Sequence, residues 1–88
     1  MKNNALKIDS RDNVAVATQP IASGNALIID GVNVCKTIED IRAGHKVALA
    51  TIPSGGDVIR YGEVIVIATG DIARGGWVHV HNTKPVVL

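Results

Sequence analysis

A short pattern that recurs four times constrains the fold more than any other feature of this sequence. It consists of an isoleucine, two variable residues, a glycine, two further residues and an aliphatic residue. The copies occupy residues 21–27, 41–47, 52–58 and 72–78. In each copy we expect the isoleucine to end a strand and pack inward, and the aliphatic residue to begin the next strand. The glycine between them is expected to take a positive φ that a Cβ would penalise.

The copies are spaced by 20, 11 and 20 residues, and because this spacing is not constant it does not predict a solenoid. It predicts two similar halves that are folded together. Since isoleucine and glycine are common residues, four unrelated turns of similar sequence are the alternative.

The apolar residues between these turns are mainly Val, Ile and Ala, and β-branched residues favour strands over helices. Five runs are predicted as strands: residues 5–8, 14–18, 47–52, 64–69 and 78–81. No run shows the apolar stripe over about ten positions that marks a helix. The best helical candidate is a single turn over residues 37–41, with Thr37 as its N-cap. The dipeptides Asp12-Asn13, Asp30-Gly31 and Tyr61-Gly62 predict turns. We therefore predict one compact all-β domain over residues 1–88, with mostly antiparallel strands.

Composition excludes several classes of partner. The 88-residue chain has a formal net charge of +1, with scattered Lys and Arg residues, whereas a nucleic-acid-binding domain needs a basic stripe. Tyr61 and Trp77 are the only aromatic residues, so no platform for stacking bases is predicted. No stretch approaches the ~20 consecutive apolar residues of a membrane span. The first residues also lack the apolar part of a signal peptide.

The single cysteine, Cys35, excludes an internal disulfide and favours a reducing compartment. It is predicted to be a small buried apolar residue, and we expect a cytoplasmic protein. A chain this short buries only a thin core, so we expect a partner, or self-association of the isolated chain, to stabilise it.

The densest group of polar side chains lies in the last predicted strand. Successive side chains of a strand alternate between its faces. Trp77, His79 and His81 should therefore share one face, while Val78 and Val80 face the core. Two imidazoles about 7 Å apart at their Cα atoms can converge on one metal ion or one anionic substrate, and histidine titrates near neutral pH. The alternative is a pair of exposed histidines without a function.

A metal site would need more ligands than these two, because zinc binds three or four protein groups. The candidates for a further ligand are His45, Cys35, Asp57 or a group of another subunit. A free-standing metal-binding protein is therefore one interpretation of the pattern.

Two further groups could bind a carboxylate. His45 and Lys46 lie on one of the glycine turns, and a turn presents side chains on a rigid base. An imidazole beside an ammonium can recognise a carboxylate, although an ordinary solvated turn is the alternative. Arg60 could hold a carboxylate in bidentate fashion, or Arg60 and Glu63 could be solvated surface charges. We predict that Tyr61 is mainly an aromatic anchor of the core, and the alternative is a phenol that donates a hydrogen bond to an oxyanion.

Four segments together resemble the SAF domain of the altronate/galactarate dehydratase family. They are residues 12–17 (DNVAVA), 44–49 (GHKVAL), 58–65 (VIRYGEVI) and 71–82, which ends in WVHVHN. The segments follow the order of the family and span most of the chain, and their combination is specific. The resemblance implies a β-clip fold, which is a bent all-β unit with long crossing hairpins. Because the sequence stops soon after Asn82, we expect a separate small subunit.

The resemblance also implies a reaction. Family members eliminate water from hexonic or hexaric acids to give 2-keto-3-deoxy acids, with a divalent metal that is usually iron. Such a reaction needs a cation to stabilise the enediolate, and groups that accept and donate protons. A domain this small cannot hold all of these groups. We therefore expect a large dehydratase subunit as partner, and an inactive isolated chain.

The chain is expected to contribute residues at the interface with that subunit. The resemblance implies His45, His79 and His81 as catalytic residues, and it implies Lys46, Arg60 and Asn82 as residues that bind the sugar acid. It also implies His79 and His81 as ligands of an Fe²⁺ ion that the partner subunit mainly holds. The alternatives are the small subunit of sulfolactate sulfo-lyase, which eliminates sulfite, and a non-catalytic carbohydrate-binding or chaperone module.

Overall fold

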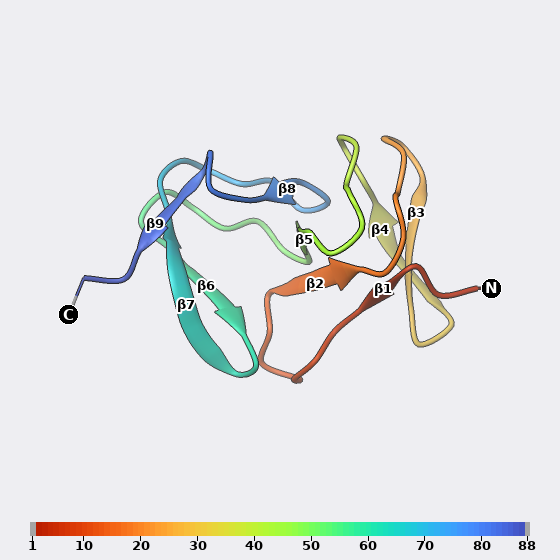
Figure 1. Cartoon of the computed structure of the whole chain (residues 1–88), viewed down its shortest axis with the longest axis horizontal. Helices are drawn as coiled ribbons and strands as arrows, with labels where there is room; N and C mark the ends of the chain where they lie inside the picture. Colours follow the sequence, from red (N-terminus) through yellow and green to blue (C-terminus); the bar gives the residue numbers. More distant parts are fainter. Residues whose placement is uncertain (1, 88) are drawn as a thin grey trace.

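Nine short strands and their loops make up residues 2–87, the part of the chain that the computed structural model describes. The central antiparallel sheet has the order β1-β2-β5-β8, with strands β1 (Ala5–Leu6), β2 (Val14–Ala17), β5 (Lys46–Ala48) and β8 (Trp77–Val78). Figure 1 shows a hairpin on one side of this sheet and a second small sheet on the other. The hairpin comprises β3 (Ala26–Ile29) and β4 (Val32–Lys36), and the second sheet comprises β6 (Asp57–Arg60), β7 (Glu63–Ala68) and β9 (Thr83–Pro85). The predicted all-β class is confirmed.

None of residues 2–87 lies in a helix, so this part of the chain contains no helix that could cross a bilayer.

The four glycine turns have the conformation that the sequence predicts. Gly24, Gly44, Gly55 and Gly75 have φ values of +85°, +82°, +82° and +84°, a region that residues with a Cβ disfavour. The isoleucine that opens each copy is buried. The closing aliphatic residues are completely buried near the starts of β3, β5, β6 and β8, and they are Leu27, Val47, Val58 and Val78.

Two halves of similar construction confirm the predicted internal repeat. Ile21 pairs with Ile41, and Ile52 pairs with Ile72, each through two backbone hydrogen bonds of 2.8–2.9 Å. In both halves an aspartate just before the second isoleucine accepts a hydrogen bond from the backbone N–H two residues after the first. Each half also has one hairpin with positive φ at both turn residues, as in a type I′ turn.

At each hairpin, one asparagine side chain bonds to the backbone where the register of the two strands is irregular. Asn13 accepts a hydrogen bond from the N–H of Ile59 at 2.7 Å and donates one to the carbonyl of Asp57 at 2.8 Å. Asn4 makes the equivalent pair of bonds, both of 2.8 Å, to the backbone of β3. Each hairpin shifts register at this place, so each side chain satisfies backbone groups that a bulge leaves unpaired.

Replacing Asn13 with alanine is expected to destabilise the domain by about 1–2 kcal/mol, because a backbone N–H and a carbonyl lose their partner. For a domain of this size that lowers Tm by roughly 4–8 °C per kcal/mol. Thermal unfolding followed by circular dichroism measures the change. Asn33→Ala, at an exposed position of β4, is the control and should melt close to the wild type. Equal melting of the two variants would show that the bulge bonds add no stability.

Each half has its own apolar core, and β2 contributes to both. The repeated isoleucines and aliphatic residues of the first two copies form one cluster, and those of the last two copies form the other. Ala15 and Ala17 of β2 pack into the first cluster, whereas Val14 packs into the second. The central sheet therefore joins the two cores and holds β8 at its edge. Cys35 is half-buried against the first cluster, not fully buried as predicted.

Three further local predictions are wrong. No helical turn forms over residues 37–41, because the Thr37 hydroxyl donates to a backbone carbonyl at 2.9 Å instead of capping a helix. Tyr61 is not a core anchor, since it lies at a hairpin turn with a φ of 57° and its side chain is 58% exposed. Strand β8 ends at Val78, and Val80, predicted to face the core, is 78% exposed in the turn that follows.

Candidate functional site

The turn after β8 is built by one asparagine. The Oδ1 atom of Asn82 accepts a hydrogen bond from the backbone N–H of His79 at 2.9 Å, and Nδ2 donates to the carbonyl of Trp77 at 2.8 Å. Such side chains compete with a neighbouring strand for backbone groups, so β8 stops and the chain turns back. His79 and His81 are carried on this turn. Asn82, predicted to bind substrate, has both ends of its amide bonded to the backbone that presents the histidines.

Trp77 and the three histidines of the chain form one cluster of rings. The His45 and His79 rings are stacked, with centroids 4.4 Å apart and planes inclined by 22°. Trp77 stacks on both, at 5.7 Å from His45 and 5.3 Å from His79, and the His81 ring lies 4.5 Å from Trp77. The antiparallel pairing of β5 with β8 explains the contact, because His45 immediately precedes β5 and His79 immediately follows β8.

Two cationic side chains, Lys46 and Arg42, lie near this ring cluster, and a third, Arg60, lies near Lys46. Lys46, the first residue of β5, is half-buried, and its pKa is lowered by burial and then by the positive charge of Arg60. The guanidinium carbon of Arg60 lies 4.9 Å from the centroid of the Tyr61 ring. Its Nε is buried without a hydrogen-bond partner among the described residues. Arg42 lies close enough to His79 to lower the pKa of that imidazole.

Within residues 2–87, no ion pair neutralises the positive charge of these groups. The ion pair in this part of the chain joins Arg11 to Asp9 at 3.0 Å. Glu39 brings one carboxylate to the cluster, but its Oε2 accepts a hydrogen bond from the backbone N–H of Trp77 at 2.9 Å. Partly buried cations without counter-ions favour a bound anion. The arrangement can therefore hold a carboxylate.

His79 is expected to make the stability of the domain depend on pH. Its pKa is lowered from 6.5, first by burial and then by its neighbours His45, Lys46, His81 and Arg42. As the pH falls, the unfolded chain takes up this proton before the folded domain does, so stability should decrease below about pH 6.5. Urea unfolding at about pH 7.5 and about pH 5.5 measures the decrease. His79→Gln, which does not titrate, should lose less stability, and equal losses would contradict the prediction.

The described residues do not complete a metal site. No group of three His, Cys, Asp or Glu side chains within residues 2–87 is arranged to hold an ion. The stacked rings of His45 and His79 face each other, whereas a metal is bound by in-plane nitrogen lone pairs at about 2.0–2.1 Å. Cys35 packs against the first core and Asp57 lies on β6. The Fe²⁺ ion with His79 and His81 as ligands stays a prediction, and no reaction step follows from it.

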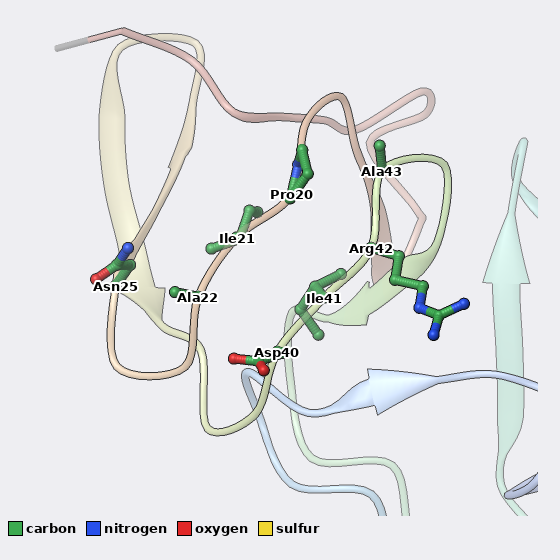
Figure 2. A pocket seen from close by; sticks show the side chains of 8 residues that line it. All are labelled: Pro20, Ile21, Ala22, Asn25, Asp40, Ile41, Arg42 and Ala43. Carbon is green, nitrogen blue, oxygen red and sulfur yellow. The ribbon is translucent and has the colours of Figure 1, made fainter.

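A surface pocket of about 530 Å³ lies beside the paired isoleucines of the first half. It is lined by Pro20, Ile21, Ala22, Asn25, Asp40, Ile41, Arg42 and Ala43. Figure 2 shows the side chain of Arg42 extending away from the other lining residues. None of the histidines lines this pocket. We therefore place the candidate site at the ring cluster, where charged groups converge, and not in the pocket.

Comparison with known proteins adds to this geometry. Residues 3–85 match the model of the altronate/galactarate dehydratase SAF domain. The chain belongs to this SAF domain family. The SAF domain is 44% identical over 79 residues to altronate dehydratase of Escherichia coli K12, covering 90% of this chain and 16% of that protein. It is 44% identical over 78 residues to galactarate dehydratase (L-threo-forming) of the same organism, covering 83% and 14% respectively.

A third relative of the SAF domain is the (2R)-sulfolactate sulfo-lyase subunit alpha of Paracoccus pantotrophus. The two are 51% identical over 45 residues, which is 51% of this chain and 67% of that subunit. The SAF domain thus spans a small part of the two dehydratases and a large part of the sulfo-lyase subunit.

The structure brings together His45, His79 and His81, which the sequence placed on two separate segments. Sequence reasoning missed Arg42, although it stands three positions before His45 on the same turn, close in sequence to Lys46. It also missed the bond from the Trp77 indole N–H to Nδ1 of His45, 3.0 Å long. That bond joins residues 32 positions apart, and nothing in the spacing of the motifs indicates it.

Proposed function

We propose that this SAF domain is the small subunit of a cytoplasmic sugar-acid dehydratase, and that its ring cluster and cations bind the substrate against a large subunit. The observation that carries the proposal is the group of imidazoles at the edge of the central sheet, with the half-buried Lys46 beside them and without an ion-pair partner among the described residues. Two relatives are named as dehydratases of sugar acids, which supports the class of reaction. The free thiol of Cys35 fits a reducing compartment.

In the proposed reaction the sugar acid loses the proton on the carbon next to its carboxylate and the hydroxyl group on the following carbon. The electrons of the broken C–H bond form a C–C double bond as the C–O bond breaks, and the hydroxyl group takes up a proton and leaves as water. The resulting enol tautomerises to a 2-keto-3-deoxy acid. Negative charge builds up on the carboxylate as the first proton leaves, and Lys46 and Arg60 stabilise it. Imidazoles suit the proton transfers because they titrate near neutral pH.

A large subunit is part of the proposal because this half of the site is open. His81 is exposed on the turn after β8, and β8 is the edge strand of its sheet. The altronate dehydratase of Escherichia coli has 84% of its length outside the region that aligns with this domain, since that region is 16% of it. A polypeptide equivalent to that remainder would cover the ring cluster and supply the groups that the domain lacks.

Binding of galactarate to the isolated 88-residue chain tests the site without the partner. The proton resonances of the three imidazoles are expected to shift with galactarate. Galactitol, which has hydroxyl groups but no carboxylate, should leave them unchanged. Lys46→Ala is expected to weaken binding about tenfold, because a hydrogen bond to a charged group contributes roughly 1.5–3 kcal/mol. Lys2→Ala, at an exposed terminal position, is the control and should bind as the wild type does. A wild-type chain that ignores galactarate, or responds equally to galactitol, would contradict the site.

The sulfo-lyase relative supports a second candidate function. If the chain is a sulfo-lyase subunit, the same cations bind sulfolactate, and the leaving group is sulfite instead of water. Incubating the complex of this chain and its large subunit with altronate, galactarate or sulfolactate separates the two functions. Release of sulfite from sulfolactate, with no keto acid formed from either sugar acid, would replace the dehydratase by the sulfo-lyase.

A further inference from the structure

The hydrogen bond between Trp77 and His45 also determines which ring nitrogen of His45 carries the hydrogen. The indole N–H of Trp77 donates to Nδ1 of His45 at 3.0 Å, and both side chains are half-buried. Indole nitrogen is a donor only, so Nδ1 must present its lone pair. In a neutral imidazole one ring nitrogen carries the hydrogen and the other accepts, so the hydrogen of His45 lies on Nε2.

We propose that Trp77 is a positioning residue that holds His45 as the Nε2–H tautomer, and that His45 thereby acts as a hydrogen-bond donor to the substrate. The role towards substrate rests on the proposed function, whereas the tautomer rests on the Trp77 bond alone. Of the three histidines that the sequence offered as acid, base or ligand, His45 is thus given a different task, that of a hydrogen-bond donor that keeps its proton.

The packing around His45 keeps the ring in this orientation. His79 stacks on one side of it, with centroids 4.4 Å apart, and Trp77 packs against both imidazoles. A rotation of the His45 ring by a half turn would take Nδ1 away from the indole. The indole N–H of Trp77 would then face a carbon atom of the imidazole. The cost is that of an unsatisfied, partly buried donor, about 1–3 kcal/mol. One orientation and one tautomer are therefore selected together.

A fixed Nε2–H group suits the step in which charge develops on the substrate. As the proton next to the carboxylate leaves, the enediolate oxygen gains negative charge, and a donor already in place stabilises it without reorganisation. His45 keeps its own proton throughout, so a different group must accept the proton from carbon. The hydrogen bonds of His79 to described residues involve its backbone, and neither its ring nor that of His81 has a partner among them. The ring nitrogens of both residues are therefore available for proton transfer.

Nitrogen NMR of the full chain tests the tautomer directly. With ¹⁵N-labelled histidine at about pH 8, where imidazole is neutral, the couplings of the ring nitrogens to Hδ2 and Hε1 identify the protonated nitrogen. We expect the wild-type His45 to be in the Nε2–H form. Trp77→Phe keeps an aromatic ring but removes the donor, so His45 should become a mixture of both tautomers. His81→Ala removes a different ring contact of Trp77 and should leave His45 in the Nε2–H form.

A His45 ring in the Nδ1–H form in the wild type would overturn the proposal, and so would an unchanged tautomer in a folded Trp77→Phe variant. If that variant does not fold, the wild-type spectrum still decides between the two forms. The galactarate titration is a separate measurement. A wild-type chain with the expected tautomer that fails to bind galactarate would refute the proposed substrate site and leave the Trp77–His45 assignment intact.

Discussion

Replacing His79 with alanine is expected to lower the turnover of the proposed dehydratase complex by at least ~100-fold, the range for loss of a group that transfers protons. The ring lies on a turn and stacks on His45 and Trp77, outside the two apolar cores. Its loss should therefore leave the fold and the assembly with the large subunit unchanged. Steady-state formation of the 2-keto-3-deoxy acid measures the effect, and His81→Ala is expected to act in the same direction.

The control for this prediction is Val80→Ala on the same turn. Val80 is 78% exposed and carries no group that could bind an anion, so this variant should turn over at the wild-type rate. Circular dichroism and co-purification with the large subunit show whether each variant folds and assembles. Wild-type turnover by an assembled His79→Ala enzyme would refute a role for His79 in the reaction.

The backbone plan of the domain could be predicted from the sequence because it depends on local chemistry. A glycine with positive φ and an inward isoleucine act within a few residues of each other, and all four copies have the predicted form. Strands β3, β4, β6 and β9 were not among the five predicted runs, although Leu27 and Val58 were predicted to begin strands. Strands β3, β4 and β6 each pair with a partner across a type I′ turn, and β9 pairs with β7. A short apolar run does not reveal such pairing.

The wrong predictions have a common cause. Side-chain hydrogen bonds and turn geometry override the local pattern, and a periodic pattern gives no sign of them. Alternation predicted a strand to residue 81, but the Asn82 side chain takes the backbone groups of Trp77 and His79 and ends it. Composition predicted a buried Tyr61, but the positive φ of the hairpin turn directs its side chain outward.

The candidate site was predictable in its residue types and not in its geometry. The sequence offers two segments rich in imidazole and cations, and only the pairing of β5 with β8 places them side by side. The approach of Arg60 to Lys46, which contributes to the lowered pKa of the lysine, joins residues of different sheets. No spacing rule relates them, since their proximity follows from how the two halves pack.

Replacing Gly75 with alanine is expected to destabilise the domain by about 3 kcal/mol or more, the range for large effects with a named steric cause. Gly75 has a φ of +84°, where a Cβ costs about 1–2 kcal/mol. In addition, the new Cβ would collide with the backbone carbonyl oxygen of Lys36. Neither backbone can move away freely, because the Gly75 carbonyl accepts a hydrogen bond from the N–H of Ile38 at 3.0 Å and its own N–H donates to Ala48 at 2.8 Å. Chemical denaturation in urea measures the loss.

The internal repeat supplies a matched control in Gly44→Ala. Gly44 occupies the same place in the first half as Gly75 in the second, with a φ of +82°, but a Cβ there would have no heavy atom within 4 Å apart from its chain neighbours. This variant should therefore lose only the conformational part, about 1–2 kcal/mol. The difference between the two variants measures how tightly the second half is held against the Lys36 backbone of the first. Equal losses would mean that the backbone adjusts at this contact. The inference that the two cores are held rigidly together, and so position the turn after β8 with its histidines, would then be wrong.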